Sequence, residues 1–135
     1  MQLQVASRKR AKIKMALQGP SGSGKTYSAL LLAFGLCGDW TKVAVIDTEN
    51  HSAELYANLG SYNTVSLSAP FTPERYVEAV QLCENAGIQV IIIDSTYHYW
   101  HGKGGLLEYN NSLGTNSYTN WAKTNPVYAK WLDKI

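Results

Sequence analysis

A glycine-rich segment near the start of the chain, residues 19–26 (GPSGSGKT), has the residue types and spacing of an anion-binding loop. It fits the pattern G-x-x-x-x-G-K-[ST], in which glycines take backbone angles barred to other residues and turn successive N–H groups inward. A helix that begins near Lys25 adds the positive end of its dipole. The expected ligand is the terminal phosphates of a nucleotide. The alternative is a glycine-rich turn that binds nothing, which the flanking strand and helix patterns disfavour.

Two side chains of this loop have specific chemistry. Lys25 should reach the β- and γ-phosphates, and we count it among the catalytic residues. The hydroxyl of Thr26 should ligate Mg²⁺, a hard ion that prefers oxygen ligands. We therefore predict ATP and Mg²⁺ as ligands. The residues expected to contact the nucleotide are Gly19, Pro20, Ser21, Gly22, Ser23, Gly24, Lys25, Thr26 and Tyr27.

Carboxylates at the ends of two apolar runs complete the predicted site. Asp94 follows four apolar residues and should hold Mg²⁺ through water at the carboxyl edge of a sheet, where open α/β sheets bind their ligands. Glu49 follows a second apolar run, and we assign it the role of the general base that orients the attacking water. Asp47 caps that strand or supports the metal site. The alternative for Glu49 and Asp47 is a pair of solvated loop acids.

The elements that must position these side chains alternate between strand and helix patterns. Short apolar runs suit strands that are covered on both faces of a parallel sheet. The helix after the glycine-rich loop is apolar nearly all round, so we expect it to be buried. Right-handed βαβ units and a three-layer αβα fold with a mostly parallel sheet follow. The expected strands are residues 13–18, 43–46, 64–67 and 88–93, and the expected helices are 26–36, 51–59 and one that begins at Pro73 after a Thr72 cap and ends near Gly87.

The chain after Asp94 contains an aromatic segment, residues 96–101 (TYHYWH). One interpretation stacks these rings on the bases of single-stranded DNA, with Lys103 on a phosphate. The other packs them against a last helix that presents Tyr128 and Trp131. The helices expected in this part are residues 106–113 and the last helix, which should start at residues 125–126.

Length and composition fit one domain with one core, since the chain has 135 residues, of which 45% are hydrophobic and 16% charged. The net charge of +2 is too small to argue for nucleic acid by itself. Residues 1–12 form a basic arm, either solvated or in contact with phosphates. We expect Cys37 and Cys83 to be buried thiols. Because no apolar run suggests a leader peptide or a membrane span, the expected compartment is a reducing cytoplasm, without a membrane partner.

Several segments together resemble RecA-type ATPases. The run Ile46-Asp47-Thr48-Glu49 is similar to the place where that family carries its catalytic glutamate, which maps onto Glu49. More closely, the chain resembles small RecA-like ATPases encoded by phages, some of which act in single-strand annealing recombination. The resemblance covers about residues 13–131, and its other segments are 54–60, the Walker B strand 89–95, the GKGG run 102–105 and residues 116–123.

This resemblance implies an ATPase that acts in phage-type DNA recombination or repair, in a bacterium or a phage-infected cell. A homo-oligomer is expected, because an arginine from a neighbouring subunit usually completes such a site. A RecA-like core normally has further parallel strands, one of them between the strand before the loop and the strand before Asp94. We therefore expect the single P-loop domain, residues 1–135, to be the N-terminal part of a longer core, with a gap or an exposed edge in its sheet.

Two other functions stay open. A nucleotide-binding module without catalysis fits a core that lacks its later strands. A small-molecule kinase is compatible with the glycine-rich loop, but such enzymes usually carry an arginine-rich lid after the core. The arginines of this chain are Arg8, Arg10 and Arg75, and none follows Asp94.

Overall fold

The centre of the molecule is a parallel sheet whose strands all end at the same edge. The computed structural model describes residues 1–7, 11–50 and 52–135. Three strands are hydrogen-bonded in the order β2-β1-β3, with bounds Asn63–Ser66, Val43–Asp47 and Val90–Asp94. In this register Asp47 lies opposite Ser66 on one side and Asp94 on the other. The segments that follow the strands are thereby gathered at one edge.

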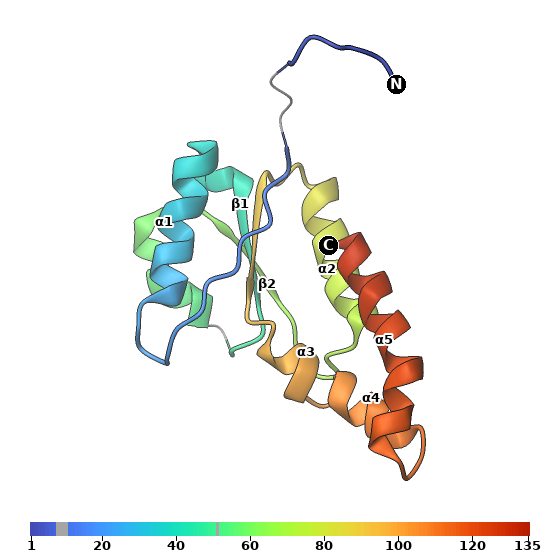
Figure 1. The fold of residues 1–135 in the computed structure, drawn as a ribbon. Helices are drawn as coiled ribbons and strands as arrows, with labels where there is room; N and C mark the ends of the chain where they lie inside the picture. The colour runs from blue at the N-terminus through green and yellow to red at the C-terminus, as the bar shows by residue number, and fades with distance from the viewer. Residues whose placement is uncertain (8–10, 51) are drawn as a thin grey trace.

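Helices cover both faces of this sheet (Figure 1). Helix α1 (Lys25–Cys37) lies on one face, and helices α2 (Pro73–Asn85) and α5 (Ser117–Lys134) lie on the other. The predicted α/β class with a parallel sheet is confirmed. Short elements connect the larger ones: η1 (Trp40–Lys42), η2 (Ser52–Leu59), α3 (Tyr97–His101) and α4 (Leu106–Ser112).

Strand β1 forms the centre of two hydrophobic clusters. All five of its residues are buried, which explains its continuous apolar sequence. Because successive side chains point to opposite faces, Ala44 and Ile46 pack on the α2 and α5 side. Val43 and Val45 pack on the side of α1. The strand therefore holds Asp47 at its end in a rigid position.

The last helix begins earlier than the sequence predicts. It starts at Ser117, not at residues 125–126, and Pro126 lies inside it. The Asn116 side chain caps its start by accepting from the backbone N–H groups of Tyr118 and Thr119. Further along, the buried Thr124 hydroxyl donates to Oδ1 of Asn110 at 2.8 Å, which joins α5 to α4. These contacts offset the backbone hydrogen bond that a proline removes.

Two expectations for the N-terminal part are wrong for the described residues. The predicted strand 13–18 is an irregular segment, in which the side chains of Ile13, Met15 and Leu17 are exposed. The predicted all-round burial of α1 also fails, because only Leu30 and Ala33 are buried. Both differences have one cause. A strand forms only beside a partner strand, and within the described residues β3 pairs with β1 alone. Residues 13–18 therefore do not extend the sheet, and α1 has less sheet to pack against.

Two smaller expectations also need correction. Residues 52–59 form 3₁₀ turns with a kink at Tyr56, where φ is −108°, and not one α-helix; the first residue of the predicted helix, His51, lies outside the described residues. Cys83 is buried, and burial raises the pKa of its thiol, whereas Cys37 is only half-buried. No helix among the described residues is long and apolar enough to cross a membrane.

Candidate nucleotide-binding site

The glycine-rich loop has the backbone shape that an anion cradle requires. Gly22 and Gly24 have φ angles of 78° and 86°, in the left-handed region that side chains disfavour. At Gly19 the restriction is steric, since an added Cβ would lie 2.7 Å from Oγ of Ser23. Gly24 immediately precedes the first residue of α1. The loop therefore leads directly into a helix N-terminus, where orphan N–H groups attract anions.

Lys25 folds back over this loop. Its ammonium group donates hydrogen bonds of 2.8 Å to the carbonyl oxygens of Gly19 and Pro20. A lysine ammonium has three donors, so these two bonds leave one donor for a further acceptor. The positive charge is thus held at the mouth of the cradle by the loop itself.

Thr26 and Asp94 meet although they are far apart in the sequence. The Thr26 hydroxyl donates to Oδ2 of Asp94 at 2.5 Å, a short bond typical of a carboxylate acceptor. Thr26 lies in the first turn of α1 and Asp94 is the last residue of β3. The two residues predicted to hold Mg²⁺ thus come from different elements to one point at the carboxyl edge of the sheet.

These residues suit a magnesium nucleotide. The donor set at this point is a hydroxyl and a carboxylate, and Mg²⁺ binds through one or two such oxygen groups together with phosphates and water. Among the residues that the structure describes, no group of three or more His, Cys, Asp or Glu side chains is placed to hold a metal. The arrangement therefore resembles a site at which Mg²⁺ binds to one or two side chains together with phosphates, and not a site in which protein side chains alone surround the metal.

Asp47 organises the turn after β1. It is buried, and its two carboxylate oxygens accept from the backbone N–H groups of Glu49, at 2.7 Å, and of Ala53, at 3.0 Å. Of the two roles considered for Asp47, these bonds support capping, because both oxygens are already engaged. The turn that results directs Glu49 away from the core, with nearly half of its side chain exposed.

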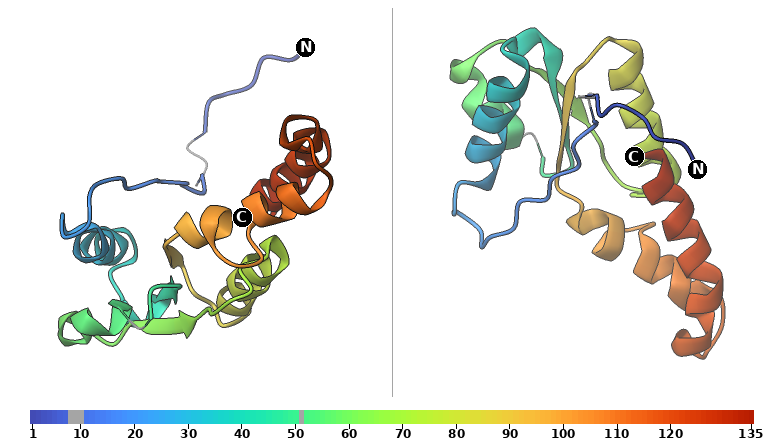
Figure 2. Two further views of the ribbon diagram at one scale, coloured as in Figure 1. Left: turned by 90° about the horizontal axis from the view of Figure 1, so that it is seen from below. Right: turned by 45° about the horizontal axis from the view of Figure 1, so that its top comes forward.

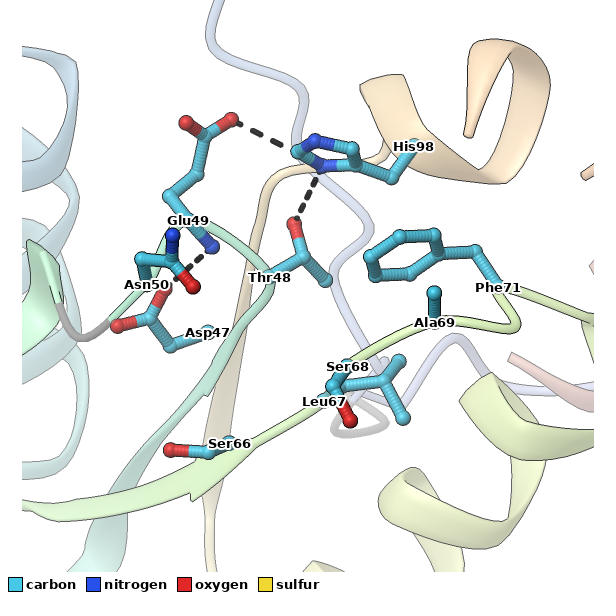
Figure 3. A pocket seen from close by; sticks show the side chains of 10 residues that line it. All are labelled: Asp47, Thr48, Glu49, Asn50, Ser66, Leu67, Ser68, Ala69, Phe71 and His98. Atoms are coloured by element: carbon cyan, nitrogen blue, oxygen red, sulfur yellow. Dashed lines mark hydrogen bonds and ion pairs between the residues drawn. The ribbon is translucent and has the colours of Figure 1, made fainter. Parts of the chain in front are cut away.

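Glu49 belongs to a polar group with three residues that sequence reasoning did not assign to the site, two of which, Thr48 and His98, are drawn in Figure 3. Its Oε1 accepts from the Ser95 hydroxyl at 3.1 Å and lies 4.0 Å from Nδ1 of His98. The same Nδ1 lies 3.0 Å from the hydroxyl of Thr48. Ser95 follows Asp94 directly, and that adjacency is the signal that could have identified it. His98 and Thr48 gave no such signal.

A cavity of about 600 Å³ opens beside Glu49 at the carboxyl ends of β1 and β2 (Figure 3). Its wall is mostly polar, and none of residues 19–26 contributes to it. A hydrophobic part of the wall comes from Phe71, whose ring stacks on His98 with 4.7 Å between ring centroids. The residues that line it are Asp47, Thr48, Glu49, Asn50, Ser66, Leu67, Ser68, Ala69, Phe71 and His98.

Some rings of the aromatic segment, residues 96–101, pack against the last helix, and others are exposed on the surface. Tyr99 is buried and stacks on Trp131 at 4.1 Å, and Trp100 lies 5.1 Å from the ring of Tyr128, so these two rings pack against α5. Tyr97, by contrast, is 60% exposed and stacks on His101 at 4.7 Å. The helix α3 therefore has an inner pair of rings with a structural role and an outer pair on the surface.

The GKGG run after this helix is a tight packing segment. Added Cβ atoms would lie 2.5 Å from Phe71 at Gly102 and 2.7 Å from Pro70 at Gly104, where φ is 79°. The carbonyl of Lys103 accepts from the N–H of Phe71 at 2.8 Å. The glycines thus allow this segment to lie against residues 70–71, of which Phe71 lines the cavity.

Comparison with known families agrees with this geometry. A family model described as an AAA domain matches residues 11–135, which is most of the chain and includes every residue of the site. Comparison with curated proteins and with solved structures gives no match.

Proposed function

We infer that this chain, which belongs to the AAA domain family, binds ATP with Mg²⁺ at residues 19–26 and hydrolyses it. The observation that carries the inference is the 2.5 Å hydrogen bond between Thr26 and Asp94, because it joins the phosphate cradle to the acidic end of β3. A glycine-rich turn without a ligand would have no need of a carboxylate brought to it from another element.

Each residue of the site has a role in this proposal. The N–H groups of the loop hold the phosphates, and Lys25 neutralises their charge at the β- and γ-positions. Thr26 and Asp94 would hold Mg²⁺, which on binding neutralises charge that develops on the phosphate oxygens. Glu49 is the general base, which accepts a proton from the water that attacks the terminal phosphorus. Release of ADP and phosphate completes the cycle.

Single-stranded DNA is the partner that we propose for this ATPase, in phage-type recombination or repair. The support is the surface pair of Tyr97 and His101, which follows β3 closely and presents flat rings to solvent. Bases stack on such rings without regard to sequence. Lys103 lies on the next turn and would contact a phosphate. Because Tyr97 and His101 follow Asp94 by only three and seven residues, bound DNA would sit close to the ATP site.

A homo-oligomer is part of the same proposal. The described residues contain a single arginine, Arg75, and it donates to the carbonyls of Ser68 and Pro70. The bond to Pro70 is 2.9 Å long, and both acceptors lie in the loop before α2. Arg75 is therefore engaged in its own loop, and we propose that an arginine of a neighbouring subunit stabilises the transition state.

The test separates binding from hydrolysis. Lys25→Ala should abolish binding of a fluorescent ATP analogue. Glu49→Gln should bind the analogue as the unchanged protein does but release no phosphate, because the amide cannot accept the proton. Binding without phosphate release in the unchanged protein would instead identify a nucleotide-binding module without catalysis.

A further inference from the structure

We propose that His98 is a positioning residue for Glu49, which it holds together with the Ser95 hydroxyl in the orientation that hydrolysis requires. This inference rests on the proposed role of Glu49 as the general base. It assigns a function to a histidine that neither the phosphate cradle nor the DNA surface uses. Its basis is the position of two polar side chains, Ser95 and His98, near one carboxylate oxygen of Glu49, with Thr48 in contact with both of those residues.

The Glu49 carboxylate is approached from two sides at the same atom. Oε1 accepts from the Ser95 hydroxyl at 3.1 Å. Nδ1 of His98 lies 4.0 Å from the same oxygen (Figure 3). The backbone of Glu49 is held separately, through the 2.7 Å bond from its N–H to Asp47. A glutamate with nearly half of its side chain exposed would otherwise sample several rotamers. The hydrogen bond from Ser95 and the nearby ring of His98 limit these rotamers.

The hydrogen bonds around Thr48 determine which nitrogen of His98 carries the proton. The Thr48 hydroxyl accepts from the N–H of Ser95 at 2.9 Å and is 3.1 Å from the Ser95 carbonyl, to which it donates. It has one hydrogen, so it cannot also donate to His98 at 3.0 Å. All three contacts are satisfied only when Nδ1 of His98 is the donor. That N–H is donated to Thr48, so the separation of 4.0 Å between Nδ1 and Oε1 of Glu49 is an electrostatic contact and not a second hydrogen bond.

The ring of His98 is itself fixed by packing. It stacks on Phe71 with centroids 4.7 Å apart and meets the edge of Tyr97 at 5.5 Å. Only 26% of its side chain is exposed. A half-buried ring between two aromatic neighbours has little freedom to rotate, so the donor stays aligned. Phe71 thereby orients His98, and His98 orients Glu49.

One part of the test measures the tautomer of His98 and does not depend on hydrolysis. Nitrogen NMR of the histidine rings at about pH 8.5, above the ordinary range of histidine titration, distinguishes the two neutral tautomers. We expect His98 to have its proton on Nδ1 in the unchanged protein. Glu49→Gln should raise the share of the Nε2–H form, because a neutral amide attracts the N–H less than a carboxylate does. The matched control is Glu84→Gln, at an exposed position on α2, which should leave the ratio unchanged.

The kinetic arm uses two substitutions of the histidine. His98→Phe keeps the ring that stacks on Phe71 but removes the donor, and it should lower kcat about tenfold, a part of the roughly 10²–10⁴ that a well-placed general base contributes. The KM for ATP should not change. His98→Asn places an amide nitrogen where Nδ1 lies and should restore kcat to within about threefold, because the hydrogen bond to Thr48 needs a donor and not an imidazole. Glu84→Gln again serves as the control.

The outcomes separate this inference from the proposed function. If the unchanged protein releases no phosphate, hydrolysis fails as a function, while the tautomer and its response to Glu49→Gln still decide whether His98 and Glu49 are coupled. A proton on Nε2 in the unchanged protein, or a tautomer ratio that ignores Glu49→Gln, overturns the inference. So does a His98→Phe protein with unaltered kcat. If His98→Phe does not fold, the NMR result and His98→Asn carry the decision.

Discussion

The hydroxyl of Thr26 and the carboxylate of Asp94 lie 2.5 Å apart, across 68 positions of sequence. Thr26 belongs to α1, the helix that follows the glycine-rich loop, and Asp94 is the last residue of β3. This contact fixes the loop against the sheet edge. It also places the two oxygen groups proposed for Mg²⁺ at one point, so its removal should affect metal-dependent binding first.

Thr26→Val should therefore reduce the affinity for ATP in the presence of Mg²⁺ by at least tenfold, which corresponds to about 1.4 kcal/mol. The valine has the shape of threonine but cannot bind a metal ion or donate to Asp94. Binding measured in excess chelator should change much less. Equal losses with and without Mg²⁺ would mean that the hydroxyl supports the fold and not the metal.

A substitution of Gly24 tests the shape of the cradle. Its φ of 86° costs about 1–2 kcal/mol for a residue with a Cβ. Gly24→Ala should therefore lower the free energy of unfolding by about that amount and weaken nucleotide binding. Gly35→Ala is the control, because Gly35 lies inside α1 with no atom near an added Cβ. That change should stabilise the protein by about 0.5–1 kcal/mol and leave binding intact.

The exposed ring pair on α3 gives a prediction for DNA. Tyr97→Ala should weaken binding of a single-stranded oligonucleotide by roughly 1–3 kcal/mol, the range for one lost base stack. Tyr109→Ala is the control, since Tyr109 on α4 is also partly exposed, at 40%. Fluorescence anisotropy of a labelled oligonucleotide measures both. Identical affinities for the two variants and the unchanged protein would contradict the DNA proposal.

The raised pKa of Tyr76 predicts that the protein loses stability at alkaline pH. Burial, and secondarily the nearby charge of Glu49, raises the pKa of its hydroxyl to about 12. In the unfolded chain a tyrosine titrates near about 10, so the folded state binds more protons between these values. The stabilisation is complete below about pH 10 and is lost as the pH rises towards 12. Burial also raises the pKa of Tyr99, which adds to the same slope.

Urea unfolding as a function of pH measures this slope. Tyr76→Phe should flatten it, because the phenylalanine has no proton to lose. Tyr118→Phe is the matched control, since Tyr118 is 86% exposed. A slope above about pH 10 that is the same in all three proteins would show that Tyr76 ionises as freely when folded as when unfolded.

The parts of the site that depend on short sequence motifs could be predicted. The glycine-rich loop is local, since its conformation follows from three glycines and one helix start, and the sheet edge at Asp94 follows from an apolar run. Strand 13–18 could not be predicted in the same way. A strand is defined by its partner, and the described residues place none beside it. The sequence pattern indicates that a segment can form a strand, but the strand forms only where the tertiary structure places another strand beside it.

Contacts between loops also could not be predicted from the sequence. The group of Thr48, Ser95 and His98 around Glu49 depends on how the turns after β1 and β3 face each other, and no spacing records that. The start of α5 is a different case. Asn116 is a residue type favoured at helix starts, but residues 117–121 (SYTNW) are only moderate helix formers and Pro126 indicated a later start.

Calorimetric titration with Mg²⁺ and ATP tests the central claim most directly. The unchanged protein should bind one nucleotide, and Lys25→Ala should lose at least about a hundredfold in affinity, or about 2.8 kcal/mol, while it melts as the unchanged protein does. Lys130→Ala, at an exposed position on α5, should bind normally. An unchanged protein that releases no heat, or a Lys25→Ala protein that binds ATP as tightly, would contradict the assignment of residues 19–26 as the phosphate site.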